Sequence, residues 1–116
     1  MNTPINNGDK LYTVTRKDIS PGYQAVQSSH AYVRFCMEHP EIAREWYENS
    51  ETMCSLSVAD EKELQELLDE ASRLGITVSA FFEPDIDFQL TAITLAPGCA
   101  TKELCANLKL ALREYS

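Results

Sequence analysis

A chain of 116 residues fits one small domain, and its 44% hydrophobic content is ordinary for a globular protein. The formal net charge of −8 argues against a broad nucleic-acid-binding surface, so any contact with RNA must be local. The chain has no apolar stretch of membrane-spanning length and no secretory segment, which predicts a cytoplasmic protein with a flexible N-terminal tail over residues 1–9 and a single domain over 10–116.

The first elements predicted within the domain are a strand, a short polar turn and a helix. The apolar run 11–15 forms the strand, Ser20 can cap the helix, and Pro21 suits its first position. Gly22 allows close approach of another group to the backbone. Free N–H groups at such a helix start favour anions such as phosphate.

The helix predicted from 22 to about 38 carries two kinds of side chain. Gln27 and His30 lie three residues apart, so they share one face of the helix. Broad apolar faces suit a helix packed on a sheet, and here they are expected to be formed by Val26, Val33 and Met37, with Ala25, Tyr32 and Cys36.

Three further elements follow in order. Pro40 breaks the first helix and can start a short second one, and the alternating residues 52–58 predict a second strand. Asp60 and Glu63 have the spacing of a capping box at the start of a third helix. Gly75 is a natural residue to end that helix.

Two more strands and a last helix complete the chain. The strands are predicted over 76–82 and 90–95, and Thr101 is expected to cap the last helix. The residues expected to face inward from that helix are Leu104, Leu108, Ala111, Leu112 and Tyr115.

This order of elements predicts an α/β fold, a three-layer α/β/α sandwich with a four-stranded mixed sheet. The short loop 83–89 leaves open whether the last two strands form an antiparallel pair or a short crossing. Ligands of open α/β sheets bind beyond strand carboxyl ends, close to helix N-termini. Residues 19–23 therefore mark the expected site.

Two stretches of this chain resemble the type-2 peptidyl-tRNA hydrolase family. That family reads Arg-x-Asp after its first strand, then Gly-Lys-x-Ala-Ala-Gln-x-x-His-Ala, and the matching residues are Arg16, Asp18, Gly22, Ala25, Gln27, His30 and Ala31. Residues 90–97 look like the family's last strand, with Thr91 at its threonine. The resemblance runs from about Lys10 to the C-terminus and implies the same α/β/α fold. One departure stands out, because Tyr23 occupies the position of the family's catalytic lysine.

The resemblance implies hydrolysis of the ester between a peptide and the terminal ribose of tRNA, by a homodimer. The residues that it assigns to catalysis are Tyr23, Gln27, His30, Glu83 and Thr91, and those assigned to substrate binding are Arg16, Lys17, Asp18 and Gly22. The cysteines and histidines have no paired metal-ligand spacing, so neither a metal nor a cofactor is expected.

The sequence leaves several alternatives open. The family has an aspartate in the loop before its threonine, and here Glu83, Asp85 or Asp87 could supply the carboxylate, with Glu83 favoured because it ends its strand at the corresponding point. Tyr23 is either a hydrogen-bond donor of the site or a surface aromatic. The altered lysine and the negative charge favour a second hypothesis, a binding or regulatory protein that keeps the fold without the chemistry.

Overall fold

The structure, a computed structural model, describes residues 4–113. Within this part of the chain the elements alternate between helices and strands, with a short 3₁₀ helix, η1, in the turn before β4. Their bounds are β1 (Leu11–Arg16), α1 (Pro21–Glu38), α2 (Pro40–Asn49), β2 (Met53–Val58), α3 (Glu61–Arg73), β3 (Val78–Glu83), η1 (Pro84–Ile86), β4 (Gln89–Leu95), α4 (Cys99–Cys105) and β5 (Lys109–Leu110).

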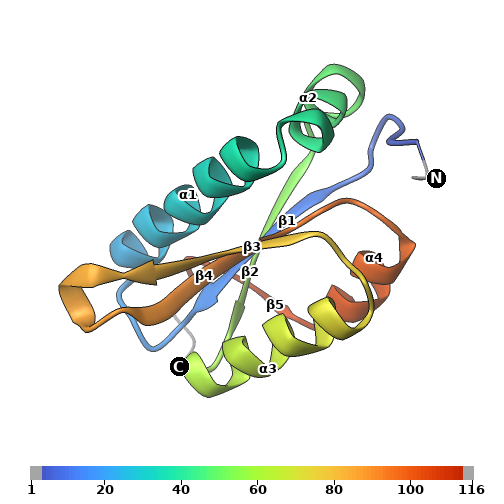
Figure 1. The fold of residues 1–116 in the computed structure, drawn as a ribbon. Helices are drawn as coiled ribbons and strands as arrows, with labels where there is room; N and C mark the ends of the chain where they lie inside the picture. The colour runs from blue at the N-terminus through green and yellow to red at the C-terminus, as the bar shows by residue number, and fades with distance from the viewer. Residues whose placement is uncertain (1–3, 114–116) are drawn as a thin grey trace.

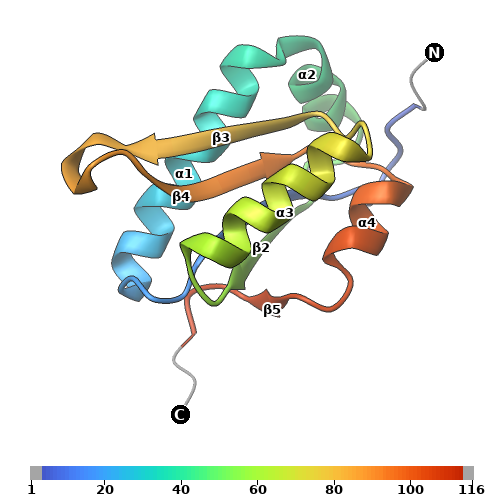
Figure 2. The same ribbon diagram turned by 60° about the horizontal axis from the view of Figure 1, so that its bottom comes forward.

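The strands form one mixed sheet in the order β3-β4-β1-β2-β5. The β1–β2 pair is parallel, and the other three pairs are antiparallel. The α/β class is confirmed, but the predicted count of four strands is wrong, because the described chain adds β5 at one edge. The loop between β3 and β4 joins an antiparallel pair. Helices α1 and α2 lie on one side of the sheet, and α3 and α4 lie on the other (Figures 1 and 2).

The last helix is much shorter than its leucine pattern predicts. It starts at Cys99 and ends at Cys105, and Thr101 does not cap it but donates its hydroxyl to the carbonyl oxygen of Ala96 at 2.7 Å. The chain then turns back, and β5 pairs with the free edge of β2, which satisfies backbone groups that would otherwise stay unpaired. The N–H of Ala111 extends this pairing to the carbonyl oxygen of Ser55. Tyr115, predicted to face inward, lies outside the described residues.

The predicted helix boundaries are otherwise confirmed by their capping contacts. The Ser20 hydroxyl accepts the N–H of Tyr23 at 3.3 Å, and the Asp60 carboxylate accepts that of Glu63 at 3.0 Å. Pro40 is the first residue of α2. After α3 the chain passes through Gly75 at a φ of +77°, a value that suits glycine.

The two faces of the sheet differ in polarity. The face under α3 is an apolar core that includes Val14, Leu64 and Ile93. The face under α1 instead carries a row of hydroxyl side chains, because the strand register places Ser79, Thr94, Thr13 and Ser55 side by side across four strands.

This polar face changes which side of α1 is buried. The residues of α1 that pack inward are Gln24, Gln27, Ala31 and Phe35. Val26, Val33 and Met37 were expected to face the sheet, but their exposed fractions are 50%, 55% and 77%. Hydrogen-bonding and small side chains suit a surface of threonines and serines better than these apolar ones do.

The predicted N-terminal tail begins in residues outside the described part of the chain. From Pro4 onward the structure describes it, and Ile5 belongs to the same buried cluster as Phe35 and Trp46. The N–H of Ile5 donates to a carboxylate oxygen of Glu45 at 2.6 Å.

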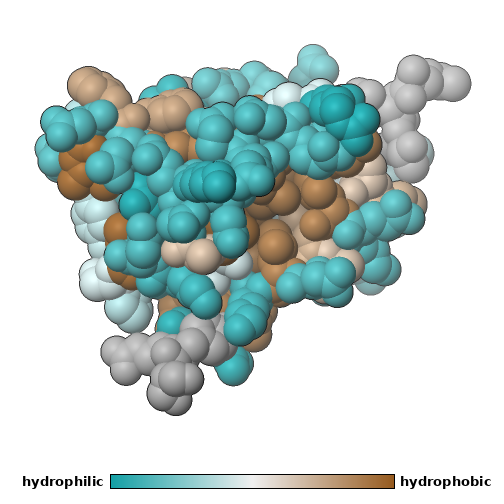
Figure 3. All heavy atoms as spheres, turned by 90° about the horizontal axis from the view of Figure 1, so that it is seen from below, coloured by the Kyte–Doolittle hydropathy of each residue, from teal (hydrophilic) through white to brown (hydrophobic). Residues whose placement is uncertain are grey.

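The surface that carries α3 and α4 contains an apolar area, seen to the right of centre in Figure 3. Partly buried side chains that pack against the apolar core include Leu68, Ile76, Leu104 and Leu108. None of the helices between residues 4 and 113 is long and apolar enough to cross a membrane.

Substitutions in α1 will distinguish its buried face from its exposed one. Phe35 is fully buried, so Phe35→Ala is expected to lower the free energy of unfolding by about 3–5 kcal/mol. Val33→Ala on the exposed face should change it by less than about 0.5 kcal/mol. Urea denaturation of both variants measures the difference. Equal losses of unfolding free energy would mean that the assignment of the buried and exposed faces of α1 is wrong.

Candidate functional site

The start of α1 places one line of side chains beside β3 and β4. Tyr23 lies in the first turn of the helix, and Gln27 and His30 follow one and two turns later on the same side. Gln27 is fully buried, Tyr23 is half-buried and His30 is exposed. Along this side of the helix, the three polar side chains therefore differ in how far they are exposed to solvent.

A β-bulge in β4 turns the Thr91 side chain toward α1. Phe81 pairs with Ala92 and Phe82 with Leu90, so Thr91 is the extra residue between them. Leu90 points into the core on the α3 side. The Thr91 hydroxyl, in contrast, donates a 2.6 Å hydrogen bond to the side-chain oxygen of Gln27 on the opposite side.

Gln27 connects Thr91 to a carboxylate. Its amide nitrogen donates to Oε1 of Glu83 at 2.9 Å, and its oxygen accepts from Thr91. Glu83 is the last residue of β3 and is 8% exposed. Its second oxygen, Oε2, faces the N–H of Asp85 at 3.4 Å.

These contacts keep Glu83 ionised. The hydrogen bond from Gln27 is the main cause that lowers the pKa of the Glu83 carboxyl, with further help from the N–H of Asp85, the charge of His30 and the hydroxyl of Tyr23, while burial opposes them. The pKa of the Tyr23 hydroxyl is shifted in the opposite direction. Partial burial, the charges of Glu83 and Asp85 and the hydrogen bond to Glu83 raise the Tyr23 pKa, so it remains a phenol that donates.

The structure thus brings together four of the five residues expected to act in catalysis: Tyr23, Gln27, Glu83 and Thr91. Of the three acidic residues left open by the sequence, Glu83 is the one hydrogen-bonded to Gln27. Asp85 lies next to it and acts on the Tyr23 pKa through its charge. Asp87 is exposed at the turn, with a left-handed φ of +58°.

His30 has a different environment from the other four. Its ring stacks on Phe81 with centroids 4.5 Å apart and an interplanar angle of 10°. Arg34, one turn further along α1, lies over the same Phe81 ring at 5.5 Å. The His30 ring thus packs against β3 beside the site, and no hydrogen bond joins it to the other four residues in the described chain.

Arg16 is bound within the protein. Its guanidinium forms a two-bonded pair with Asp18 at 2.8 and 2.9 Å and reaches Gln89 at 2.8 Å, and it is 8% exposed. The hydrogen bond with Asp18 is the main cause that raises the Arg16 pKa and lowers that of Asp18. Arg16 and Asp18 thus fix the start of β4 to the end of β1.

The other residues expected to bind substrate are more accessible. Gly22 is exposed, and a side chain built at its position would meet no other atom within 4 Å. Lys17 and Asp18 line a hollow of about 560 Å³ at the start of α1, together with Ile19, Pro21, Gln24, Ala59 and Arg113. This hollow therefore brings the cations Lys17 and Arg113 to the beginning of the helix.

Sequence reasoning missed three polar residues that support this region. Gln24 is buried and spans from the carbonyl oxygen of Ile19 to the N–H of Leu112. Glu61 accepts the N–H of Leu90, and Gln89 accepts from Arg16. The regular spacing of Gln24, Gln27, Ala31 and Phe35 was a signal for the buried face, whereas the contacts of Glu61 and Gln89 have no sequence signature.

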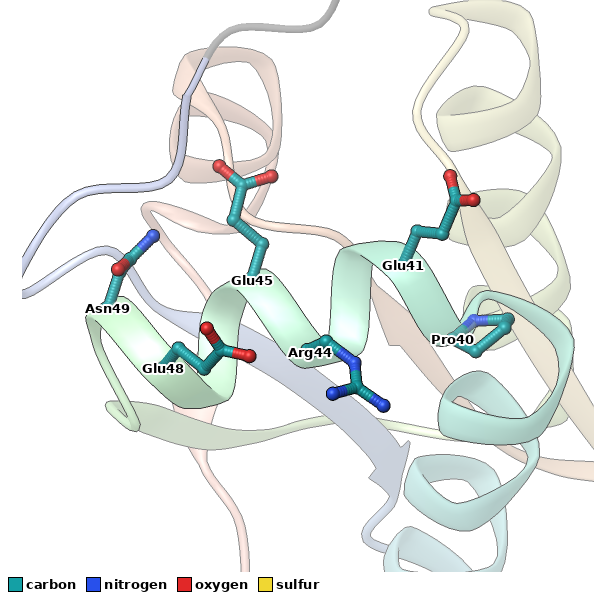
Figure 4. Close-up of a pocket in the computed structure, with 6 residues that line it drawn as sticks. All are labelled: Pro40, Glu41, Arg44, Glu45, Glu48 and Asn49. Atoms are coloured by element: carbon teal, nitrogen blue, oxygen red, sulfur yellow. The ribbon is translucent and has the colours of Figure 1, made fainter.

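A second hollow, of about 450 Å³, lies along α2, and the side chains that line it do not point toward a common centre (Figure 4). Its lining comes from this single helix, and Glu41 and Glu45 project to one side while Arg44 projects to the other. Among the described residues, no group of three His, Cys, Asp or Glu side chains is placed to hold a metal ion.

Comparisons with known proteins agree with the resemblance seen in the sequence. The family model described as Peptidyl-tRNA hydrolase PTH2 matches residues 10–111. No curated protein matches the chain. Among solved structures, the chain is similar to a protein of unknown function, Atu0240, from Agrobacterium tumefaciens strain C58. The two are 13% identical with a TM-score of 0.66, over 87% of this chain and 96% of that one, a likeness that supports the fold alone.

The hydroxyl of Thr91 is expected to stabilise the site as well as to shape it. Thr91→Val keeps the shape of the side chain but leaves the buried Gln27 oxygen without its donor, so it should lower the free energy of unfolding by about 1–3 kcal/mol. Thr91→Ser retains the hydroxyl and serves as the control. Equal stability of the two variants, measured by urea denaturation, would show that the 2.6 Å bond contributes nothing.

Proposed function

The chain belongs to the peptidyl-tRNA hydrolase PTH2 family, and we propose that it hydrolyses the ester between a peptide and the terminal ribose of tRNA. The observation that carries this proposal is the chain of hydrogen bonds Glu83–Gln27–Thr91, with the Tyr23 phenol close enough to Glu83 for each group to shift the pKa of the other. It presents an ionised carboxylate and a protonated phenol side by side at the start of α1. Ester hydrolysis needs these two functions, a base for water and a donor for the developing oxyanion.

In the proposed reaction Glu83 acts as the general base. It takes a proton from a water molecule while the water oxygen attacks the carbonyl carbon of the ester. The Tyr23 hydroxyl, which has a single proton, turns it from Glu83 to the oxyanion that forms. The bond from carbon to the ribose oxygen then breaks, and the proton held by Glu83 passes to that oxygen.

Gln27 and Thr91 hold the base in place. The amide of Gln27 occupies Oε1 of Glu83, so the other oxygen, Oε2, is the one assigned to water. Thr91 fixes the amide in the orientation that donates, because its hydroxyl occupies the Gln27 oxygen. A fixed base loses little entropy in the transition state, which is the contribution assigned to these two residues.

The hollow at the start of α1 is proposed to receive phosphates of the tRNA. Lys17 and Arg113 line it, and the positive end of the α1 dipole favours anions there. Arg16 is not assigned this role, because Asp18 and Gln89 already bind its guanidinium. Such a local contact accommodates tRNA on a chain whose net charge is −8.

A second candidate function is binding of tRNA without hydrolysis. The observation that favours it is Tyr23, a neutral group where the family has its lysine. A phenol stabilises an oxyanion less than an ammonium does. Under either function we propose a cytoplasmic location and a homodimer, as expected from the sequence. Sedimentation of the purified chain tests the dimer.

The function is tested by incubating the protein with peptidyl-tRNA and measuring the release of free tRNA. Glu83→Gln removes the base and is expected to lower the rate by about 10²–10⁴-fold. Glu103→Gln, which changes an exposed carboxylate on α4, is the matched control and should keep the rate.

The pH profile gives an independent check on Glu83. Its pKa lies below the ordinary value of 4.5, so the carboxylate stays available as a base down to that pH and the rate falls only below it. A rate that already falls by half near pH 6 would assign the base to another group. Absence of cleavage by the wild type, together with retained binding of tRNA, would favour the second candidate.

Substitution of Tyr23 tests the replacement of the family's lysine. Tyr23→Lys introduces a cation beside Glu83, and the rate is expected to rise by up to about 10²–10³-fold, because a charged donor stabilises an oxyanion strongly in a site shielded from water. Tyr23→Phe, which removes only the hydroxyl, should lower it. If Tyr23→Lys lowers the rate while the fold is intact, the phenol has a role of its own that a cation does not replace.

A further inference from the structure

A third cavity lies at the opposite end of the sheet from Glu83. Its lining includes Tyr12 at the start of β1, Thr77 before β3 and Ala96 after β4, whereas the candidate site uses the other ends of β3 and β4. Its volume is about 630 Å³, within the usual range of about 300–1,000 Å³ for small-molecule sites.

One wall of this cavity is apolar. It is built where α3 ends and α4 begins, from Leu74, Ile76, Pro97, Cys99 and Ala100. Leu74 is 44% exposed, although it is a large apolar side chain. The apolar area in Figure 3 lies on the same side of the sheet, that of α3 and α4. This wall suits the apolar body of a ligand.

Two acidic side chains, Asp9 and Glu45, line the cavity, and each accepts a backbone N–H. The carboxylate of Asp9 accepts the N–H of Asn6 at 2.8 Å, and that of Glu45 accepts the N–H of Ile5 at 2.6 Å. The Thr101 hydroxyl donates to a backbone carbonyl. These contacts turn one oxygen of each carboxylate toward the N-terminal segment 5–6.

The donors around the cavity, in contrast, remain available. Lys10 and Lys102 both line it and are exposed, and neither forms an ion pair with a residue in the part of the chain from 4 to 113. Tyr12 lines it as well, and burial is the main cause that raises its pKa, so its hydroxyl stays protonated and can donate. Two ammonium groups and a phenol therefore face a half-apolar space in a chain of net charge −8.

We propose that this cavity binds a small organic carboxylate with an apolar body. The carboxylate lies between Lys10 and Lys102, and the apolar body packs against Leu74 and Ile76. The site is separate from the Tyr23–Thr91 site and does not depend on the proposed hydrolase function.

The proposal is tested with 2-naphthoate and the full chain, by following backbone amide signals in NMR titrations at low ionic strength. Binding should shift the amides of Gly8, Gly75 and Gly98 in a saturable way. The neutral isostere 2-naphthamide should bind about tenfold more weakly, since it loses charge-assisted hydrogen bonds to the lysines. Equal affinity for the two compounds, or shifts centred on Tyr23 and Gln27 instead, would overturn the proposal.

Two pairs of variants separate the charged and apolar parts of the site. The double variant Lys10→Gln with Lys102→Gln should weaken naphthoate binding about tenfold, whereas Lys62→Gln on the exposed side of α3 should leave it unchanged. Ala100→Trp fills the cavity and should abolish binding, and Ala106→Trp, at the other end of α4, should not. Unchanged binding in the double variant or in Ala100→Trp would place the ligand elsewhere.

Discussion

The side chain of Gln27 is the contact on which the arrangement of the candidate site depends. It is fully buried, and both of its polar ends are used, one by Thr91 of β4 and the other by Glu83 of β3. A buried amide left unpaired would be costly, so α1 is held at the one position along the hairpin where both partners are within reach. The carboxylate can only accept at that end, which fixes the direction in which the amide points.

The polar character of the α1 interface follows from this arrangement. The opposite face of the sheet is held by apolar packing, whereas the face under α1 combines an apolar cluster around Phe35 with the directional hydrogen bonds of Gln27. Next to the turn of the hairpin, Arg16 and Glu61 add contacts to Gln89 and to the N–H of Leu90. The start of β4 is thus held from both faces of the sheet, and Glu83 and Thr91 keep their spacing.

Features that depend on local backbone chemistry could be predicted from the sequence. Ser20, Asp60 and Gly75 act at helix ends as their residue types indicate. The partner strands and the faces of helices were harder to predict, because they depend on distant residues. The leucines after Cys105 have helical spacing, yet the free edge of β2 draws residues 109–110 into the sheet.

The same limit applies to the candidate site. The motif match predicted Tyr23, Gln27 and Thr91, but the sequence left Glu83, Asp85 and Asp87 open as the source of the carboxylate and favoured Glu83 only by its place at the end of a strand. Their distances to Gln27 are set by the register of β3 against β4, including the extra residue in β4, and the sequence carries no visible mark of that register. The apolar side chains of Val26 and Val33 predicted the wrong buried face of α1, because the sequence does not show that this helix packs on a row of hydroxyl side chains.

The bulge at Thr91 also bears on how a chain of this fold gains or loses its site. Side chains of a regular strand alternate between the two faces, so a deletion of one residue at this bulge would restore the alternation and leave Leu90, Ala92 and Ile93 on the faces they now occupy. The sheet would keep its core, but the partner of the Gln27 oxygen would be gone. A deletion of one residue at this position would therefore remove the contact between Thr91 and Gln27 while the apolar core of the sheet is kept.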